Sequence, residues 1–232
     1  MRKANVWLTT LAVIALIAAL ATPAAWAKRL EDAEVYFEIN DTDGDAGIHV
    51  FLDGVGWDMM QMTGPNGVEF SVLAESGVGM QGITEFFFES AEPSFEEQSL
   101  DELLALFPEG RYRFIGTTTE GNRLRGKARL NHSLPDAPIL LFPAEGDEVD
   151  PDDAVFSWGE VDDPAGGEID VYQVVVECEE PGSEIAVEVP ADILQITIPP
   201  EIFEGQEECK WEVLAVEEYG NRTISEAAFD LE

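Results

Sequence analysis

Short runs of alternating apolar and polar residues follow one another along most of the chain after Lys28. A period of two places apolar side chains on one face of a β-strand. Clusters of glycine, proline, asparagine and aspartate separate the runs, as in turns between strands. In the first half the predicted strands cover residues 33–39, 47–52, 68–73, 82–88, 111–115 and 123–130. The pattern predicts an all-β protein.

One segment has helical spacing instead. Ser99 and Glu102 form a capping box, in which the hydroxyl accepts an early backbone N–H and the carboxylate reaches back. Pro108 and Gly110 end the segment after about two turns. The apolar residues at three- and four-residue spacing are Leu100, Leu103, Leu104 and Phe107. A helix this short must pack on the strands to be stable.

Pro135 and Pro138 indicate a boundary between two domains. Two prolines within four residues stiffen a connection and remove backbone donors. We expect a first domain at residues 30–134, a linker at 135–138 and a second domain at 137–232. Both lengths suit β-sandwiches.

The N-terminus has the layout of a cleavable signal peptide over residues 1–27. Arg2 and Lys3 precede an apolar run at residues 6–21, and Ala25 and Ala27 place small residues before Lys28. The alternative is a membrane anchor, for which the run is shorter than the roughly 20 residues of a spanning helix. We therefore expect an exported protein that is periplasmic, at the cell surface or extracellular.

The charge of the chain is strongly negative. The sequence has 48 Asp and Glu against 12 Lys and Arg, and loss of Arg2 and Lys3 gives 10 − 48 = −38 for the mature chain. Such a field repels nucleic-acid phosphates and anionic lipid headgroups and favours cations and basic partners. We expect no nucleic-acid binding. The simpler interpretation of the charge is a solvated surface suited to a salty medium.

The second half resembles a fibronectin type III domain. The predicted strands are 155–158, 172–178, 209–215 and 223–229. The residues behind the resemblance are Trp158, Tyr172, Val213, Ala215, the turn at Gly220 and Asn221, and Ser225. The resemblance covers about 95 residues and implies a seven-strand Greek-key sandwich without chemistry of its own.

Two cysteines, Cys178 and Cys209, are present, and export to an oxidising compartment favours one disulfide. The family has a tyrosine opening the sixth strand where this chain has Cys209, and Cys178 ends the third strand. Because the third and sixth strands are antiparallel neighbours in the family, the resemblance implies a Cys178–Cys209 bond in place of the tyrosine tether. The alternative is two buried free thiols.

The first domain resembles an immunoglobulin-like sandwich with a short helix. The matching feature is a corner in which Leu104, a helical turn and Gly110 precede Tyr112 at the start of a strand. Together, the two modules resemble exported bacterial proteins, and this resemblance implies no activity. The fold prediction is two tandem β-sandwiches.

The acidic segment at residues 40–47 is a candidate calcium loop. Asp41, Asp43 and Asp45 alternate, so a tight turn could direct their carboxylates onto one hard cation. The EF-hand pattern fails, because Ala46 replaces its glycine and Leu52 replaces its terminal glutamate. Another loop geometry could recruit Asp53 or Asp58. The alternative is an acidic β-turn without an ion.

The sequence offers weak support for catalysis. His49 and His132 are the only histidines, and neither accompanies a nucleophile motif. Glu85, Glu89 and Glu92 are close enough in sequence for glycoside hydrolysis, but so acidic a chain brings carboxylates together by chance. We therefore predict that the protein is not an enzyme.

The function predicted from the sequence is a non-catalytic extracytoplasmic binding or adhesion module for a protein or glycan. One alternative is a structural spacer or subunit of an envelope assembly, and another is a secreted hydrolase. Beyond the possible Ca²⁺ no cofactor is expected, and no membrane insertion is expected after cleavage.

Overall fold

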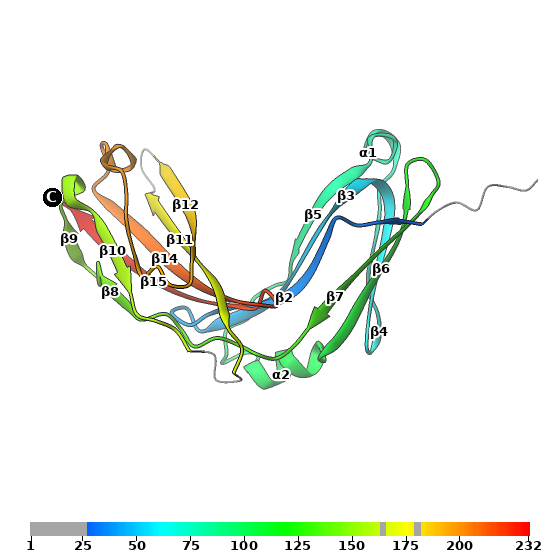
Figure 1. Ribbon diagram of the computed structural model, residues 1–232, viewed down its shortest axis with the longest axis horizontal. Helices are drawn as coiled ribbons and strands as arrows, with labels where there is room; N and C mark the ends of the chain where they lie inside the picture. Colours follow the sequence, from blue (N-terminus) through cyan, green and yellow to red (C-terminus); the bar gives the residue numbers. More distant parts are fainter. Residues whose placement is uncertain (1–26, 163–165, 179–181) are drawn as a thin grey trace, which may run out of the picture.

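The computed structural model describes residues 27–162, 166–178 and 182–232. Nearly all of the predicted signal peptide lies outside the described residues. Strands make up most of the described chain, as the alternating pattern predicts. They form two arms that meet in a V, with β2 and β15 at the junction (Figure 1). Each arm has its own cluster of buried hydrophobic residues.

The first arm contains the elements up to residue 130. Its strands are β1 (Lys28–Arg29), β2 (Asp32–Asn40), β3 (Asp45–Gly64), β4 (Gly67–Leu73), β5 (Ile83–Glu89), β6 (Gly110–Thr118) and β7 (Arg123–Leu130). Its helices are α1 (Ser76–Gln81) and α2 (Leu100–Leu106). The sequence pattern did not predict α1, and it predicted only the first part of β3.

The long strand β3 belongs to both layers of the first arm. Its first part pairs with β2 and β5, and its second part pairs with β4 and β6. The pairing register shifts between Asp53 and Trp57, where Gly54 and Gly56 lie. Strands that bend at such irregularities can pass from one sheet to the other. The side chains of β2 and β3 can thus enclose a core with those of β6 and β7.

The predicted helix and corner are present in the first arm. The Ser99 hydroxyl accepts the Glu102 N–H, and the Glu102 carboxylate accepts the Ser99 N–H, which completes the capping box of α2. Leu103 of α2 is buried in the core. The Tyr112 hydroxyl donates to the Pro108 carbonyl at 3.1 Å, which fixes the entry into β6.

The second arm consists of two sheets. The smaller has the order β13 (Gln195–Thr197), β10 (Val155–Trp158), β8 (Leu140–Phe142). The larger contains β12 (Ser183–Pro190), β11 (Ile169–Cys178), β14 (Glu208–Glu217) and β15 (Arg222–Leu231), and β9 (Asp147–Val149) pairs with β15. Two 3-10 turns, η1 (Pro151–Asp153) and η2 (Pro200–Phe203), complete the arm.

Aromatic residues and one disulfide hold the second core. Phe156 contacts Trp211 edge-to-face, with ring centroids 5.1 Å apart, and Trp158 contacts Tyr172 at 5.5 Å. Cys178 and Cys209 face each other in the β11–β14 ladder and form a disulfide. The pairing implied by the family resemblance is confirmed.

The junction between the arms is a continuous backbone ladder. Residues 222–224 of β15 pair in parallel with residues 38–40 of β2, so one sheet runs from the second arm into the first. The Asp41 N–H extends the ladder by donating to the Ile224 carbonyl at 3.0 Å. The residues 135–138 predicted as a linker take part in the junction, because the Thr223 hydroxyl donates to the Pro135 carbonyl at 2.8 Å.

Asn221 connects three segments at this junction. Its side-chain oxygen accepts the Phe37 N–H at 2.9 Å, and its amide group donates to Asn131 and to the Ser133 carbonyl. Its own N–H donates to the Glu217 carboxylate at 3.1 Å. Asn221 is almost fully buried. A buried amide with its hydrogen bonds satisfied fixes a single arrangement of the segments it joins.

Within the described chain, no helix combines the length and the apolar character that a membrane-spanning segment requires.

Replacement of Asn221 by alanine is expected to lower the free energy of unfolding by about 1–3 kcal/mol, because it leaves the buried Phe37 N–H without its acceptor. Denaturant titration measures the change. Asn122→Ala is the matched control, since Asn122 lies in a turn and its amide donates to exposed Glu120; its effect should stay within about 0.5 kcal/mol. Equal losses in the two variants would contradict the assigned role of Asn221.

Candidate functional site

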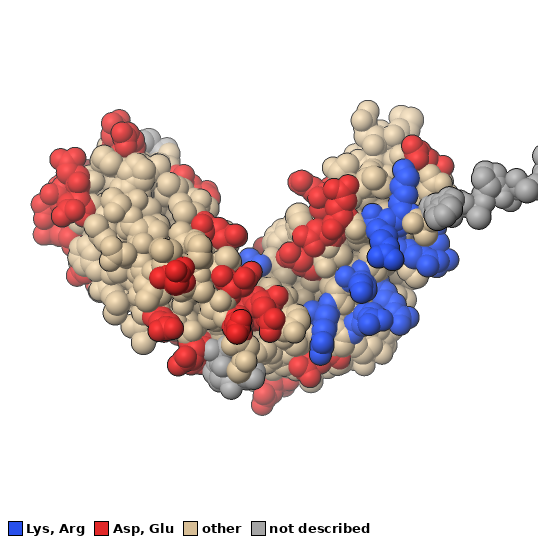
Figure 2. All heavy atoms as spheres, viewed as in Figure 1, with Lys and Arg blue, Asp and Glu red and all other residues tan. Residues whose placement is uncertain are grey.

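The positive charges of the chain are concentrated on the first arm. Residues 28–134 have 8 Lys and Arg against 20 Asp and Glu, a net charge of −12, whereas residues 135–232 have 2 against 28, a net charge of −26. Figure 2 shows most of the basic side chains gathered on one arm, while acidic side chains lie on both arms. The total charge of the chain is strongly negative, but its distribution is uneven and leaves one region of the first arm basic.

All eight basic residues of the first arm lie on three neighbouring strands, β1, β7 and β6. Alternation along β6 and β7 turns their Tyr112, Phe114, Leu124 and Leu130 into the core and their basic residues outward. We call this surface the basic face. It consists of Arg29, Arg111, Arg113, Arg123, Arg125, Lys127 and Arg129, whereas Lys28 is in register with inward-facing Leu124 and lies beside this face.

The register of β6 and β7 places like charges directly opposite each other. Arg111 pairs with Arg129, and Arg113 pairs with Lys127. Side chains at such positions have Cβ atoms about 5 Å apart, and like charges there reduce stability. The basic face therefore has an electrostatic cost in the isolated protein, and a bound anion would remove it.

Few carboxylates compensate these charges within the described chain. Lys28 of β1, beside the basic face, forms an ion pair with Glu120, with Nζ 3.0 Å from Oε2. The guanidinium of Arg129 lies 5.8 Å from the ring centre of Tyr219. Across the described residues, no carboxylate oxygen lies within 4.0 Å of a basic group on β6 or β7.

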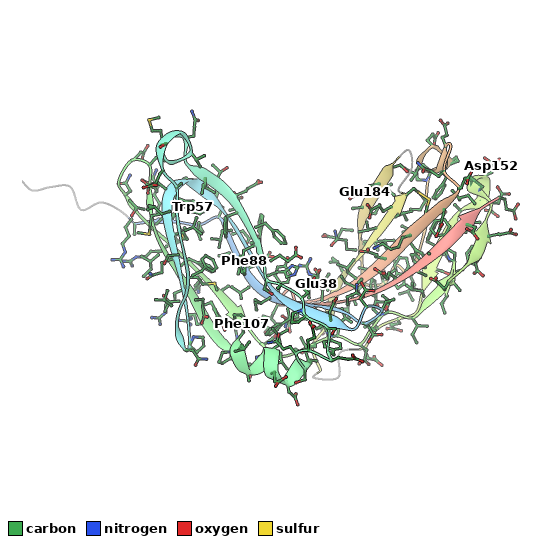
Figure 3. All side chains as sticks on the ribbon, turned by 180° about the vertical axis from the view of Figure 1, so that it is seen from behind. Glu38, Trp57, Phe88, Phe107, Asp152 and Glu184 are labelled. Atoms are coloured by element: carbon green, nitrogen blue, oxygen red, sulfur yellow. A yellow bond between two sulfur atoms is a disulfide. The ribbon has the colours of Figure 1, made fainter. Side chains whose placement is uncertain are left out.

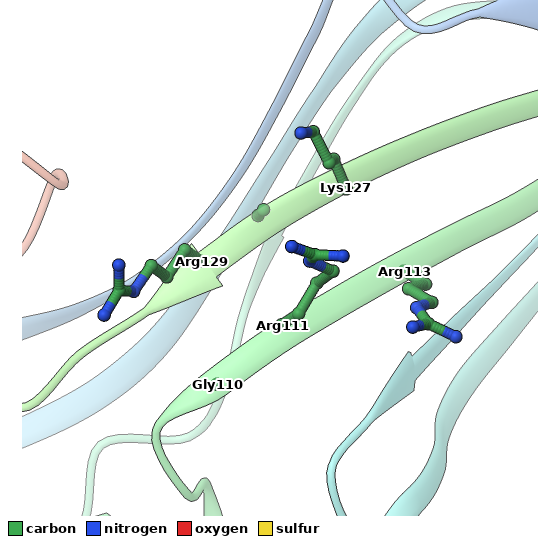
Figure 4. Close-up of a pocket in the computed structure, with 6 residues that line it drawn as sticks. Gly110, Arg111, Arg113, Lys127 and Arg129 are labelled. Atoms are coloured by element: carbon green, nitrogen blue, oxygen red, sulfur yellow. The ribbon is translucent and has the colours of Figure 1, made fainter.

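The basic face contains two open hollows. One, of about 540 Å³, is lined by Gly110, Ala128 and four basic residues, Arg111, Arg113, Lys127 and Arg129 (Figure 4). The other, of about 690 Å³, extends the surface to Arg123, Arg125 and Arg29, and its lining also includes Glu31 and Asp32 at one edge. Both are open, so an extended ligand could lie across the two strands.

Arginine makes up six of the seven basic residues of this face. A guanidinium presents a planar set of donors that matches a carboxylate, sulfate or phosphate group in a bidentate manner. The face can thus bind acidic groups, and it has no buried cleft around reacting atoms. Sequence reasoning missed it, although the alternation of basic residues at 111–113 and 123–129 was visible.

The residues predicted as a calcium loop lie in the turn between β2 and β3. Asp41 and Asp43 are in the turn, and Asp45 begins β3. The side-chain oxygen of Asn40 accepts the N–H groups of Thr42 and Asp43, which shapes the turn as the alternative interpretation expects. The three carboxylates do not converge as one ligand group within the described residues. Calcium binding here stays a prediction.

The structure brings together a different set of metal-ligand types. One ligand atom each from Glu38, His49 and Glu92 lies within 4.8 Å of the others. Sequence reasoning weighed His49 and Glu92 only as catalytic groups and did not consider Glu38, because these residues are far apart in sequence. Cys178 and Cys209 are bonded to each other in the disulfide, so neither offers a thiolate to a metal ion.

No protein-family model and no curated protein matches the chain. Among solved structures, similarity is found to one described as "Structural insight into host cell surface retention of a 1.5-MDa bacterial ice-binding adhesin", with 13% identity, 89% of this chain covered and a TM-score of 0.28. A second, a "tetra-tandem repeat in extending region of large adhesion protein", has 13% identity, 87% of this chain covered and a TM-score of 0.31.

A third solved structure concerns a "Ca2+-stabilized adhesin" that "helps an Antarctic bacterium reach out and bind ice", with 11% identity, 86% of this chain covered and a TM-score of 0.25. The present chain spans 66%, 50% and 49% of the three matched chains. All three descriptions concern adhesion proteins. At TM-scores below 0.5, these structures establish no function for this chain.

Replacement of Arg113 by threonine is expected to raise the free energy of unfolding by about 0.2–1 kcal/mol at low ionic strength, because it removes a like-charge pair with Lys127. The gain should shrink as salt screens the repulsion. Denaturant titration at two ionic strengths measures it. Arg123→Thr is the matched control, because Arg123 lies opposite uncharged Thr117. A loss of stability in Arg113→Thr at low salt would contradict the expected repulsion.

Proposed function

We propose that this protein is a non-catalytic extracytoplasmic adhesion module that binds an anionic glycan through the basic face. The observation that supports this most directly is the row of cations on β6 and β7, which have no carboxylate partner among the described residues and are held outward by the core residues beneath them. The glycan would present carboxylate or sulfate groups to these side chains.

The spacing of the basic residues suits a linear polymer. Alternate residues along a strand are about 6.7 Å apart, and the two strands lie about 5 Å apart. Arg123, Arg125, Lys127 and Arg129 therefore form a straight row beside Arg111 and Arg113. A flexible chain of acidic sugars can follow such a row with successive acidic groups.

The composition of the face favours a glycan over an acidic protein. The centres of protein–protein interfaces are depleted of charged residues and enriched in aromatic ones. Here charged side chains occupy the centre, and Ile115 is the exposed large hydrophobic residue among the outward-facing side chains of β6 and β7. A glycan needs no such hydrophobic centre.

The negative total charge does not exclude this binding. The Debye length is about 8 Å at physiological ionic strength, so a ligand on the basic face is screened from the distant second arm. The net charge of that arm instead opposes anion binding elsewhere on the molecule. The same reasoning limits the earlier inference that anionic partners are repelled, because that inference treated the charge as uniform.

We further propose fibronectin type III topology for the second arm. The orders β13-β10-β8 and β12-β11-β14-β15 support it, as does the antiparallel pairing of β11 with β14 that the resemblance implied. An immunoglobulin-like corner at Tyr112 supports the assignment proposed for the first arm. Such folds act as binding modules or spacers and determine no ligand by themselves.

Binding of heparin, a sulfated and carboxylated glycan, is expected at low salt and should weaken steeply as salt rises. Arg113→Gln should weaken it about 10-fold, because it removes one charge-assisted contact. Calorimetric titration gives the affinity. Lys210→Gln removes the same charge from the second arm and should leave the affinity unchanged.

Three results would overturn the glycan proposal. The first is the absence of heparin and polygalacturonate binding at low salt, and the second is an equal loss of affinity in both variants. The third is concentration-dependent self-association of the protein that Arg113→Gln abolishes, since this would assign the basic face to the acidic arm of a second copy.

A second candidate function, a spacer in an envelope assembly, is favoured by the continuous ladder between β2 and β15. Such a ladder together with the buried Asn221 should hold the two arms at one angle. Small-angle X-ray scattering is expected to fit a single V-shaped particle, and Asn221→Ala should broaden the distribution of dimensions. A broad distribution for the unaltered protein would contradict the spacer function.

A further inference from the structure

A group of metal-ligand side chains lies at the base of the V, away from the basic face. Glu38 projects from β2, His49 from β3, and Glu92 from the segment after β5. Figure 3 places Glu38 at the junction of the arms. In the β2–β3 ladder Glu38 is opposite Gly47, and His49 follows two residues later on the same face.

Gly47 makes room for the third side chain. A Cβ atom at this position would lie 2.8 Å from both Cγ and Oε1 of Glu92. Contacts this close do not occur in folded proteins, so a side chain at position 47 would displace Glu92 from the cluster. Because Gly47 of β3 has no side chain, two glutamates can approach the same histidine.

The distances within the group suit a metal ion. His49 Nε2 lies 3.3 Å from Glu92 Oε1, and His49 Nδ1 lies 3.8 Å from Glu38 Oε2. Zinc bonds to nitrogen and oxygen are about 2.0–2.2 Å, which separates two tetrahedral ligand atoms by about 3.4 Å. The two carboxylates approach different nitrogens of the ring, so one of them must move for both to share an ion bound to a single nitrogen.

The imidazole of His49 is suited to act as a ligand. Its side chain is 3% exposed, and Nδ1 is a buried nitrogen without a hydrogen-bond partner in the described chain. The rings of Tyr36 and Phe87 pack on it, with centroids 5.3 and 5.5 Å away.

The surroundings contain more negative than positive charge. The carboxylates whose charges act on Glu92 are Glu38, Glu89 and Asp45. Arg222 is the basic residue nearby, with Nε 4.0 Å from Glu38 Oε2 and its guanidinium 4.0 Å from the ring centre of Tyr36. Arg222 can offset one carboxylate, whereas a divalent cation would offset two.

We propose that Glu38, His49 and Glu92 bind a divalent transition-metal ion, with Zn²⁺ as the best match. A neutral imidazole with two carboxylates is a ligand set that zinc accepts, whereas calcium takes oxygen ligands almost exclusively. A water molecule would supply the fourth ligand. The ion would join β2, β3 and the segment after β5 beside the ladder that connects the two arms.

Zinc titration of chelator-treated protein, followed by calorimetry, tests the proposal. We expect one tight site, superimposed on weak binding by surface carboxylates. Glu92→Gln and His49→Gln should each weaken the tight site by at least about 10-fold. Glu34→Gln is the matched control, because Glu34 lies on the same face of β2 outside the ligand group, and it should bind as the unaltered protein does.

The ring nitrogens of the two histidines provide a second measurement. In NMR spectra, zinc should shift the ring nitrogens of His49 and leave those of His132 unchanged. Circular dichroism verifies that each variant is folded, and Glu92→Gln, in a partly exposed residue, decides the test if His49→Gln does not fold.

Three results would overturn the proposal. These are zinc affinity in the unaltered protein no tighter than in Glu92→Gln, an equal loss in Glu34→Gln, and displacement of zinc from the tight site by equimolar calcium. Glycan binding involves other residues, so failure of the zinc site would leave the function proposed for the basic face intact.

Discussion

The parallel ladder between β2 and β15 is the interaction on which the rest of the molecule depends. Backbone hydrogen bonds across residues 38–40 and 222–224 turn two sandwiches into one continuous sheet. The Asn221 side chain satisfies backbone groups from two other segments beside it. Because a buried backbone group left unpaired is costly, the ladder and Asn221 together select one relation between the arms.

That relation also places side chains from distant parts of the sequence together. Arg222 enters β15 directly after Asn221 and reaches Tyr36 and Glu38 of β2 in the other arm. Its charge lies beside the Glu38, His49 and Glu92 group. The metal site proposed there and the junction between the arms therefore share residues, and a bound ion would act on the part of the fold that sets the angle of the V.

The distribution of charge is the second organising feature. The second arm has a net charge of −26, as expected for the solvated acidic surface that was the simpler interpretation of the total charge. The first arm gathers all of its basic residues on β1, β6 and β7, where cross-strand pairs repel each other. A fold optimised for stability alone would intersperse the signs on this face. The basic face keeps like charges that repel each other, and this is the physical reason for assigning ligand binding to that face.

Several features followed from the sequence alone, the strands and the helix start because local physics determines them and the disulfide because a family resemblance implied it. Period-two alternation determined the main strands, the pair Ser99 and Glu102 determined the start of α2, and the resemblance in the second half anticipated the Cys178–Cys209 bond. The shared sheet, the like-charge pairs of the basic face and the approach of Glu92 over Gly47 required the tertiary structure. They depend on strand register and on contacts between residues far apart in the chain, and no local pattern encodes either.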